Sequence, residues 1–542
     1  MTEDDPFENM LSERKIINGL MVIAGLILGP YLVASSLENN QVPILIFGCS
    51  AFLFLIFFVI GDAICIFPLL GVFLTLQLNF IPLGFTAQEV FSIVLILYYV
   101  VAYLAMRQRR INFGPAIFFI PSFVIAAIIL YHDHKFGLHA FGGSENGSRA
   151  GVLVLIAILA YFSGINIPTP PIKLLRWLPW LCLVMTCITA FPLVLTTYIP
   201  STAPFMFHIT ANVNVGAYFE SLDEADSTGL GLDAAGGRAG FLAGIAVALQ
   251  VFLLSHFPIN TWWRPNRWFA VLLSFVCLWL VLIGGYRSGF VMYLLLIFLG
   301  ALCYCTWRLI FFVPLAAIAL LAFIMIQNEH PGSLRLPVAM QRSMSFLPGG
   351  KWDPEVSYST QASNDFRQNI KRVYIQEYLY KSPWVGNGFA FDPHESDEMS
   401  KLAQTADTPD RYYEAKAFIV VKGFHTGWIS LYDAVGLVGS AAFLFFGGSM
   451  VLVSGLFVFG RGADRKSPLY PLKVWIFCYL AQDIVGYFTV FGSFTATFPT
   501  FCAYAIILTH LRKIERDSVT QVVLPIHQEP LGQRGAVRPL TA

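Results

Sequence analysis

The fold class of this protein follows from residues 268–304, WFAVLLSFVCLWLVLIGGYRSGFVMYLLLIFLGALCY. Two apolar runs, 267–285 and 288–304, meet at Gly284–Gly289 with almost no loop between them. A helix that crosses a membrane needs about 20 mostly apolar residues, because each residue rises about 1.5 Å through a hydrocarbon core about 30 Å thick. Each run is close to that length, so the stretch predicts two consecutive transmembrane helices.

Similar apolar runs recur along the chain. Of its 542 residues, 56% are hydrophobic and 12% are charged, and the mean hydropathy is +0.66. This composition excludes a soluble enzyme, a disordered chain and a fibrous protein, and a net charge of +1 gives no general attraction for nucleic acid. We therefore predict an all-α polytopic membrane protein with about 12–14 transmembrane helices. The predicted spans are 17–36, 42–60, 62–80, 87–106, 112–131, 149–165, 174–196, 240–257, 267–285, 288–304, 308–326, 428–459, 472–490 and 494–511.

Basic residues predict the orientation of these spans. Lys and Arg concentrate in alternate loops, which by the positive-inside rule places both termini in the cytoplasm. Two long polar segments then face outward, and we expect the longer one to fold as a helical subdomain. The predicted division is 1–196 (N-terminal transmembrane helices), 197–239 (first outer loop), 240–326 (central transmembrane helices), 327–427 (large outer loop), 428–511 (C-terminal transmembrane helices) and 512–542 (disordered cytoplasmic tail).

Two glycine-flanked arginines lie at the predicted outer surface. Arg287 follows Tyr286 in GGYRSG (284–289), and Arg238 lies in GGRAG (236–240). Glycine allows a ligand to approach the backbone closely, and a guanidinium matches phosphate oxygens with two parallel hydrogen bonds. Two such groups facing outward would hold a diphosphate. The alternative is that each arginine extends to the lipid headgroups, as basic residues near helix ends often do.

A histidine and an aspartate lie where the large outer loop ends. His425 starts the stretch HTGWISLYDAVGLVG, and Asp433 follows eight residues later, about two helical turns away on roughly the same face. A histidine at a water boundary titrates near neutral pH and can act as a base. The alternative is a histidine that only caps an interfacial helix.

These features together resemble a known family, the O-antigen ligase and O-antigen polymerase superfamily of GT-C membrane glycosyltransferases. In that family the large outer loop carries an arginine, a helix, a proline and G-x-G-F, followed by H-N-x-x-L-x-x-L-x-E-x-G-L-x-G. The chain departs from the pattern at Thr426, Asp433 and Tyr286, where the family more often has asparagine, glutamate and a small residue. The matching residues are Arg372, Pro383, Gly386, Gly388 and Phe389 in the first motif, and His425, Leu431, Gly436, Leu437 and Gly439 in the second.

The resemblance implies transfer of a glycan from undecaprenyl diphosphate to a sugar hydroxyl on the periplasmic face of the bacterial inner membrane. It implies that Arg238 and Arg287 stabilise the leaving diphosphate and that His425, oriented by Asp433, receives the acceptor proton. It also implies that Arg372, Tyr286, Gly386 and Gly388 bind the substrate. The expected partners are the lipid-linked oligosaccharide donor, a glycan or lipid A-core acceptor, the bilayer and a polysaccharide chain-length regulator.

No cofactor or metal is expected, because the acidic run at 392–398 is more simply explained as a solvated loop. Polymerase, ligase and protein O-oligosaccharyltransferase all remain open within this class. The competing class is a membrane transporter or a flippase for lipid-linked oligosaccharide, which should carry ionisable residues along the bilayer midplane and repeat symmetry.

Overall fold

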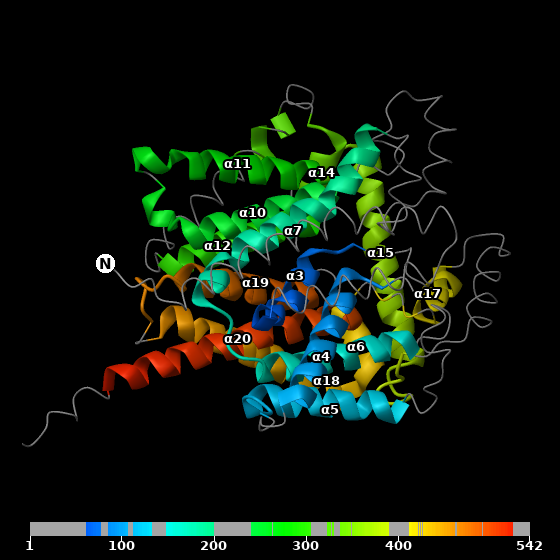
Figure 1. Cartoon of the computed structure of the whole chain (residues 1–542). Coiled ribbons are helices and arrows are strands. Elements are labelled where there is room, and N and C mark those ends of the chain that lie inside the picture. The colour runs from blue at the N-terminus through cyan, green and yellow to red at the C-terminus, as the bar shows by residue number, and fades with distance from the viewer. Residues whose placement is uncertain are drawn as a thin grey trace, which may run out of the picture.

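The structure is a computed structural model, and the part of the chain that it describes is helical (Figure 1). The described residues are 61–76, 85–106, 112–132, 148–199, 240–262, 264–304, 322, 324–326, 328–329, 336–347, 350–389, 411–420, 422, 424, 426–460, 463–489 and 492–523. The helices are η1 (Gly61–Ile66), α3 (Phe67–Phe73), α4 (Ala87–Met106), α5 (Ala116–His132), α6 (Ser148–Asn166), α7 (Ile172–Tyr198), α10 (Gly240–His256), η5 (Ile259–Thr261), η6 (Pro265–Arg267), α11 (Trp268–Ile283), α12 (Arg287–Tyr304), α14 (Val338–Met344), α15 (Pro354–Glu377), α17 (Arg411–Val420), α18 (Gly427–Phe459), α19 (Tyr470–Thr489) and α20 (Phe494–Val523).

Six described helices are long and apolar enough to cross a membrane, and four shorter ones are also apolar. The six membrane-length segments are Arg149–Asn166, Ile172–Leu195, Pro265–Ile283, Arg287–Tyr304, Gly427–Phe459 and Phe494–Asp517. The prediction of a helical multi-pass membrane protein is therefore confirmed at this level. The predicted spans 17–36 and 42–60, and most of 308–326, lie outside the described residues, so the full helix count stays a prediction.

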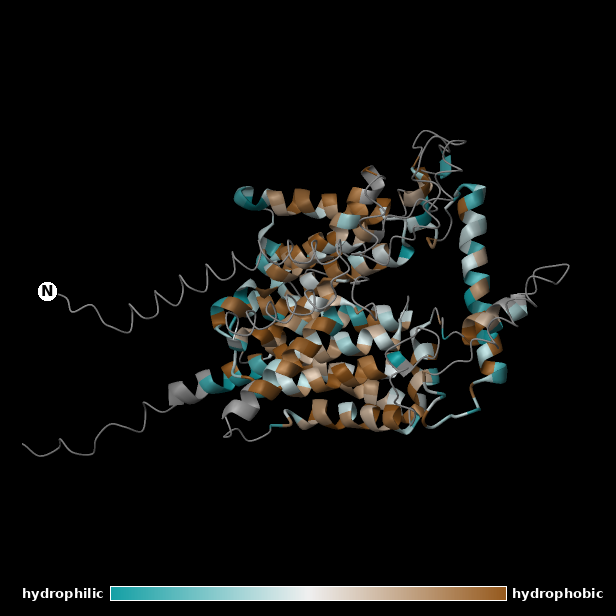
Figure 2. Cartoon of the chain, turned by 45° about the vertical axis from the view of Figure 1, so that its right-hand side comes forward, coloured by the Kyte–Doolittle hydropathy of each residue, from teal (hydrophilic) through white to brown (hydrophobic). Residues whose placement is uncertain are grey.

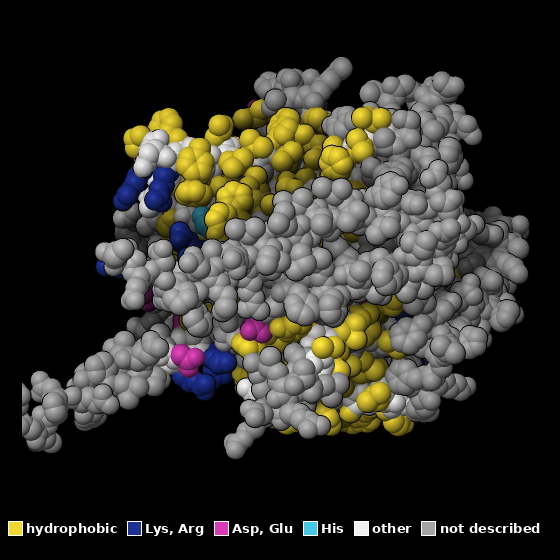
Figure 3. All heavy atoms as spheres, viewed as in Figure 1, with side chains coloured by type: hydrophobic (Ala, Val, Ile, Leu, Met, Phe, Trp, Pro, Cys, Tyr) yellow, Lys and Arg dark blue, Asp and Glu magenta, His cyan; other side chains and the backbone are white. Residues whose placement is uncertain are grey.

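The exposed surface of α11 is what a lipid-facing helix presents. Trp268, Leu272, Phe275 and Trp279 recur at helical spacing on α11, and each side chain is more than half exposed. Figure 3 shows hydrophobic side chains in the upper and lower parts of the visible face that are not grey, with Lys and Arg gathered toward the left. A water-soluble protein rarely exposes contiguous apolar surface of this kind. Contact with the hydrocarbon core of a bilayer explains why these apolar side chains are exposed.

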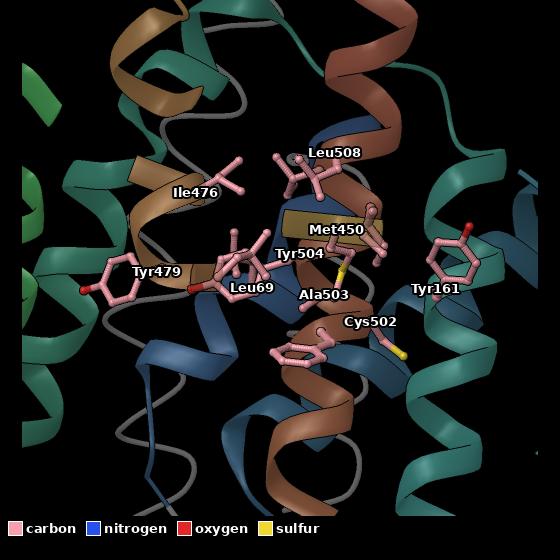
Figure 4. Packing of buried hydrophobic residues seen from close by; sticks show 14 of the residues in the cluster. Leu69, Tyr161, Met450, Ile476, Tyr479, Cys502, Ala503, Tyr504 and Leu508 are labelled. Carbon is pink, nitrogen blue, oxygen red and sulfur yellow. The ribbon is translucent and has the colours of Figure 1, made fainter. Parts of the chain in front are cut away.

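The core forms where α18, α19 and α20 meet α5 and α6. Trp475 of α19 and Phe498, Phe501 and Tyr504 of α20 are almost completely buried. Figure 4 shows Tyr504, Leu508 and Ile476 at this packing, with Tyr161 of α6 nearby. Since α20 is surrounded by other helices along its first half, its position is determined by packing and not by lipid.

Within the predicted large outer loop, 327–427, the described residues form α14, α15 and α17 together with turns, among them the segment that follows α15. Figure 2 shows α15 as a polar helix standing beside the hydrophobic bundle. One face of α15 nevertheless packs on α17 and the start of α18, through Ile370 and Val373 against Ile419 and Ile429. The loop subdomain is therefore docked on one end of the bundle. The C-terminal part of α20 leaves from the opposite end (Figure 1).

Two predicted boundaries are wrong. The predicted span 62–80 is a 3-10 turn followed by the short α3, which ends at Phe73. The Thr189 hydroxyl of α7 explains this end, because it donates to the Phe73 carbonyl oxygen at 3.0 Å and accepts from the Thr75 amide at 3.1 Å. The predicted tail begins too early, because α20 continues to Val523 and Glu515 pairs with Lys473 of α19.

Candidate functional site

The carboxylate of Asp433 lies at the centre of a buried hydrogen-bond network. One of its oxygens accepts from the Asn387 amide at 2.8 Å and from the Tyr374 hydroxyl at 3.3 Å. The other lies 2.6 Å from Nζ of Lys422. Burial, followed by the charge of Asp433, raises the pKa of Tyr374, so its phenol stays protonated and donates. Residues from α15, the turn after it, the segment before α18 and α18 itself thus meet at one carboxylate.

The two sequence motifs of the outer loop form one structural unit. The backbone from Pro383 to Asn387 lies against α18, with Asn387 N donating to Asp433 O at 2.6 Å and Leu437 N donating to Pro383 O at 2.9 Å. A third bond joins Val438 N to Trp384 O at 3.0 Å. These bonds replace helical bonds that α18 loses at this point. The motifs lie far apart in the sequence, and tertiary structure joins them.

Glycine is required on both sides of this contact. Gly436 interrupts the helical backbone of α18 with φ 64° and ψ −163°, and Gly386 has φ 79°. A Cβ on Gly386 would lie 2.5 Å from Gly436 N, and one on Gly436 would lie 2.3 Å from Gly386 N. Any other residue at either position would separate the two backbones.

The end of α5 completes the unit. Nε2 of His132 donates to the Val385 carbonyl oxygen at 2.9 Å, and a Cβ on Gly388 would lie 3.1 Å from the His132 side chain. Nothing in the spacing of His132 points to Val385, which lies 253 residues away in the chain.

A cavity of about 530 Å³ opens beside Asp433. Lys422 and Asp433 line one part of it, and Arg149 and Glu89 line another, with Nη2 of Arg149 3.7 Å from Oε2 of Glu89. The cavity therefore combines two ion pairs with hydroxyl groups and aromatic rings, which is a lining suited to a polar, hydroxyl-rich ligand. Further lining residues are Thr86, Ser92, Gly388, Phe389, Phe424, Ser430 and Thr495.

Arg287 contacts α15 at a different position from the Asp433 network. It begins α12 after the left-handed turn at Gly285 (φ 73°), and its Nη1 lies 3.4 Å from the Asn364 side-chain oxygen. Tyr286 beside it is exposed. Asn364 and Tyr374 are ten residues apart on α15, or about 15 Å, so this helix connects the Arg287 turn with the Asp433 network.

The other predicted site residues are placed as follows. Arg372 lies on α15 with an exposed side chain and does not line the cavity beside Asp433. Arg238 and His425 lie outside the described residues, so their roles stay predictions, as does the orientation of His425 by Asp433. Sequence reasoning missed Lys422 and Asn387. Lys422 precedes His425 by three residues and Asn387 lies between the two motif glycines, so proximity to the motifs was the available signal.

Among the described residues, no group of three His, Cys, Asp or Glu side chains is arranged to hold a metal ion. No family model matches the chain, and no curated protein matches it.

Proposed function

We propose that the protein is a membrane glycosyltransferase that transfers or polymerises undecaprenyl-diphosphate-linked glycans at the periplasmic face of the bacterial inner membrane. The observation that carries the proposal is the joining of the G-x-G-F segment to α18 at Gly436, which places Asp433 in the wall of a polar cavity. Both termini are cytoplasmic in this proposal. Exopolysaccharide or O-antigen polymerase and O-antigen ligase are members of the same class.

The reaction assigns a separate task to each residue. The bond from the anomeric carbon of the donor sugar to the diphosphate breaks, and a bond from that carbon to the acceptor hydroxyl oxygen forms. Arg287 and Arg238 stabilise the negative charge that the diphosphate gains, which is most effective at a low-dielectric boundary. His425 accepts the acceptor proton. Asp433, held by Lys422 and Asn387, orients His425.

Product analysis tests the proposal. The full chain in lipid nanodiscs is incubated with undecaprenyl-diphosphate oligosaccharide, with and without a lipid A-core acceptor. Chain growth without that acceptor supports a polymerase, and transfer to the acceptor supports a ligase. Arg287→Ala should lower the rate by about 10²–10³-fold, as expected for a lost electrostatic stabiliser, while Arg516→Ala at the opposite end of the bundle leaves it unchanged. No change in the glycan under either condition rejects the proposal.

A transporter or flippase is the second candidate, and two observations favour it. Asp483 lies within α19, in the predicted span 472–490. An ionisable group in a membrane helix often serves transport. A further cavity, of about 1170 Å³, lies at the opposite ends of α6, α18 and α20 and is lined by Asp464, Lys473 and Lys513. Passage of the oligosaccharide lipid across a proteoliposome bilayer without any change in its bonds would support this candidate over the enzyme.

A further inference from the structure

A third cavity, of about 420 Å³, lies between α3, α12, α19 and α20. Its volume lies within the usual range of small-molecule pockets. Val72, Phe73 and Met292 give it apolar walls. Its polar lining comes from Ser288 of α12, from Gln482, Asp483 and Tyr487 of α19, and from Thr497 and Thr500 of α20.

Two buried polar atoms of residues lining this cavity lack hydrogen-bond partners in the described part of the chain. They are the side-chain oxygen of Gln482 and the hydroxyl of Tyr487, and the exposed fractions of these residues are 9% and 2%. Buried polar groups are almost always paired, because an unpaired one has lost its water without compensation. Asp483 takes part in none of the ion pairs found among the described residues. These groups therefore match a ligand that supplies hydrogen-bond donors.

The position of the cavity connects it with the candidate site. Ser288, which lines it, directly follows Arg287, and Ala496 lines both this cavity and the one beside Asp433. Asp483 is six residues from the end of α19, so it lies about 9 Å inside that end of the helix. The cavity thus lies between the arginine turn and the Asp433 cavity, at the end of the bundle that carries the outer loop.

We propose that this cavity binds the sugar next to the diphosphate of the lipid-linked donor, an inference that rests on the proposed function. A sugar carries several hydroxyl donors for Gln482, Asp483 and Tyr487, and apolar ring faces for Phe73 and Met292. With the sugar here, the diphosphate lies toward Arg287, and the anomeric carbon faces the acceptor cavity past the small side chain of Ala496.

Binding of two lipids tests the assignment. The full chain in nanodiscs is titrated with radiolabelled undecaprenyl diphosphate and with the same lipid carrying one N-acetylhexosamine. Gln482→Leu and Tyr487→Phe should each weaken binding of the sugar-bearing lipid by about tenfold, the effect of one lost hydrogen bond, and leave binding of the sugar-free lipid unchanged. Tyr161→Phe, which removes a buried hydroxyl of α6 that does not line this cavity, is the matched control and should change neither.

The outcomes separate this inference from the proposed function. If the unaltered chain binds both lipids and transfers glycan, but the two variants change neither affinity or change both equally, the sugar site is rejected and the enzyme stands. Binding of neither lipid by the unaltered chain rejects both proposals. Thermal protection by sodium chloride but not choline chloride, lost in Asp483→Asn, would assign the cavity to a cation and overturn the sugar. Tyr487→Phe keeps the ring that packs on Phe443, so it tests the site even if Gln482→Leu fails to fold.

Discussion

At the scale of single residues, the Asp433 carboxylate shows how a polar network is built in the first turns of a membrane-length helix. Its side chain is 2% exposed and that of Lys422 is 24% exposed. A charge in that position is tolerated because each oxygen has a donor, and removal of one partner leaves the other charge without compensation. Asn387 and Tyr374 supply the remaining bonds.

A double-mutant cycle tests the ion pair between Lys422 and Asp433. Lys422→Met should lower the free energy of unfolding by about 2 kcal/mol, less than for a fully buried pair because Lys422 is partly exposed. Adding Asp433→Asn to Lys422→Met should restore part of the loss, since the uncompensated charge is removed. Melting temperatures of the purified protein in one detergent give the measurement. Losses that simply add in the double variant would show that the two side chains do not interact.

At the scale of elements, α18 is two helical pieces joined at a backbone break, and the break creates the surface on which the outer loop docks. Gly436 leaves the helical conformation, and the amides of Leu437 and Val438 bond to Pro383 and Trp384 instead of the preceding turn. A sequence pattern shows one continuous apolar run here. The break in α18 brings Gly436 against Gly386 and leaves the Asp433 carbonyl oxygen free to accept from Asn387 N. These tertiary hydrogen bonds offset the cost of the helical bonds that are lost.

Two alanine substitutions in α18 test this interpretation. Gly436→Ala should destabilise the protein by at least about 2 kcal/mol, because the residue has a positive φ and its Cβ would overlap Gly386. Gly448→Ala, in the same helix, meets nothing within 4 Å and should be neutral or stabilising by up to about 1 kcal/mol. The melting temperature and the protease sensitivity of the outer loop report the difference. Equal effects of the two substitutions would contradict a specific role for the break.

At the scale of the whole molecule, the helices have two distinct ends. The polar helices α15 and α17 lie at one end, and the basic C-terminal part of α20 extends from the other (Figure 1). The distribution of Lys and Arg predicts that the end with α15 faces the periplasm. Under the proposed function this polarity matters, because the lipid-linked donor has to approach Arg287 and the Asp433 cavity from the periplasmic side.

Cysteine labelling measures this orientation. Tyr380→Cys and Arg516→Cys place a thiol at two positions, each with a 78% exposed side chain, at opposite ends of the bundle. A membrane-impermeant maleimide should label position 380 in intact spheroplasts and position 516 only after permeabilisation, above the background of the unaltered chain. The reverse pattern would place the candidate site in the cytoplasm and reject a periplasmic transferase.

The sequence by itself determined the membrane class and most of the helix positions. Bilayer thickness sets the length of an apolar run, and this is a local property that can be read from residues 149–165 or 288–304 without knowledge of their neighbours. The observed α6 and α12 match those ranges within one residue. The loop motifs also stood out, because glycine, proline and an isolated arginine are unusual beside long apolar runs. Their interpretation as parts of one glycosyltransferase site rests on the family resemblance and stays a prediction.

Only the tertiary structure decided which of these residues meet. Val385 contacts His132 across 253 residues, and Asp433 binds Asn387 across 46. Such contacts depend on how helices pack, which no local pattern encodes. The same reason explains why α3 ends at a hydroxyl from α7, why the apolar run of α18 breaks at Gly436, and why Asp433 pairs with Lys422. Local chemistry selects the helices, and packing between distant segments builds the cavities.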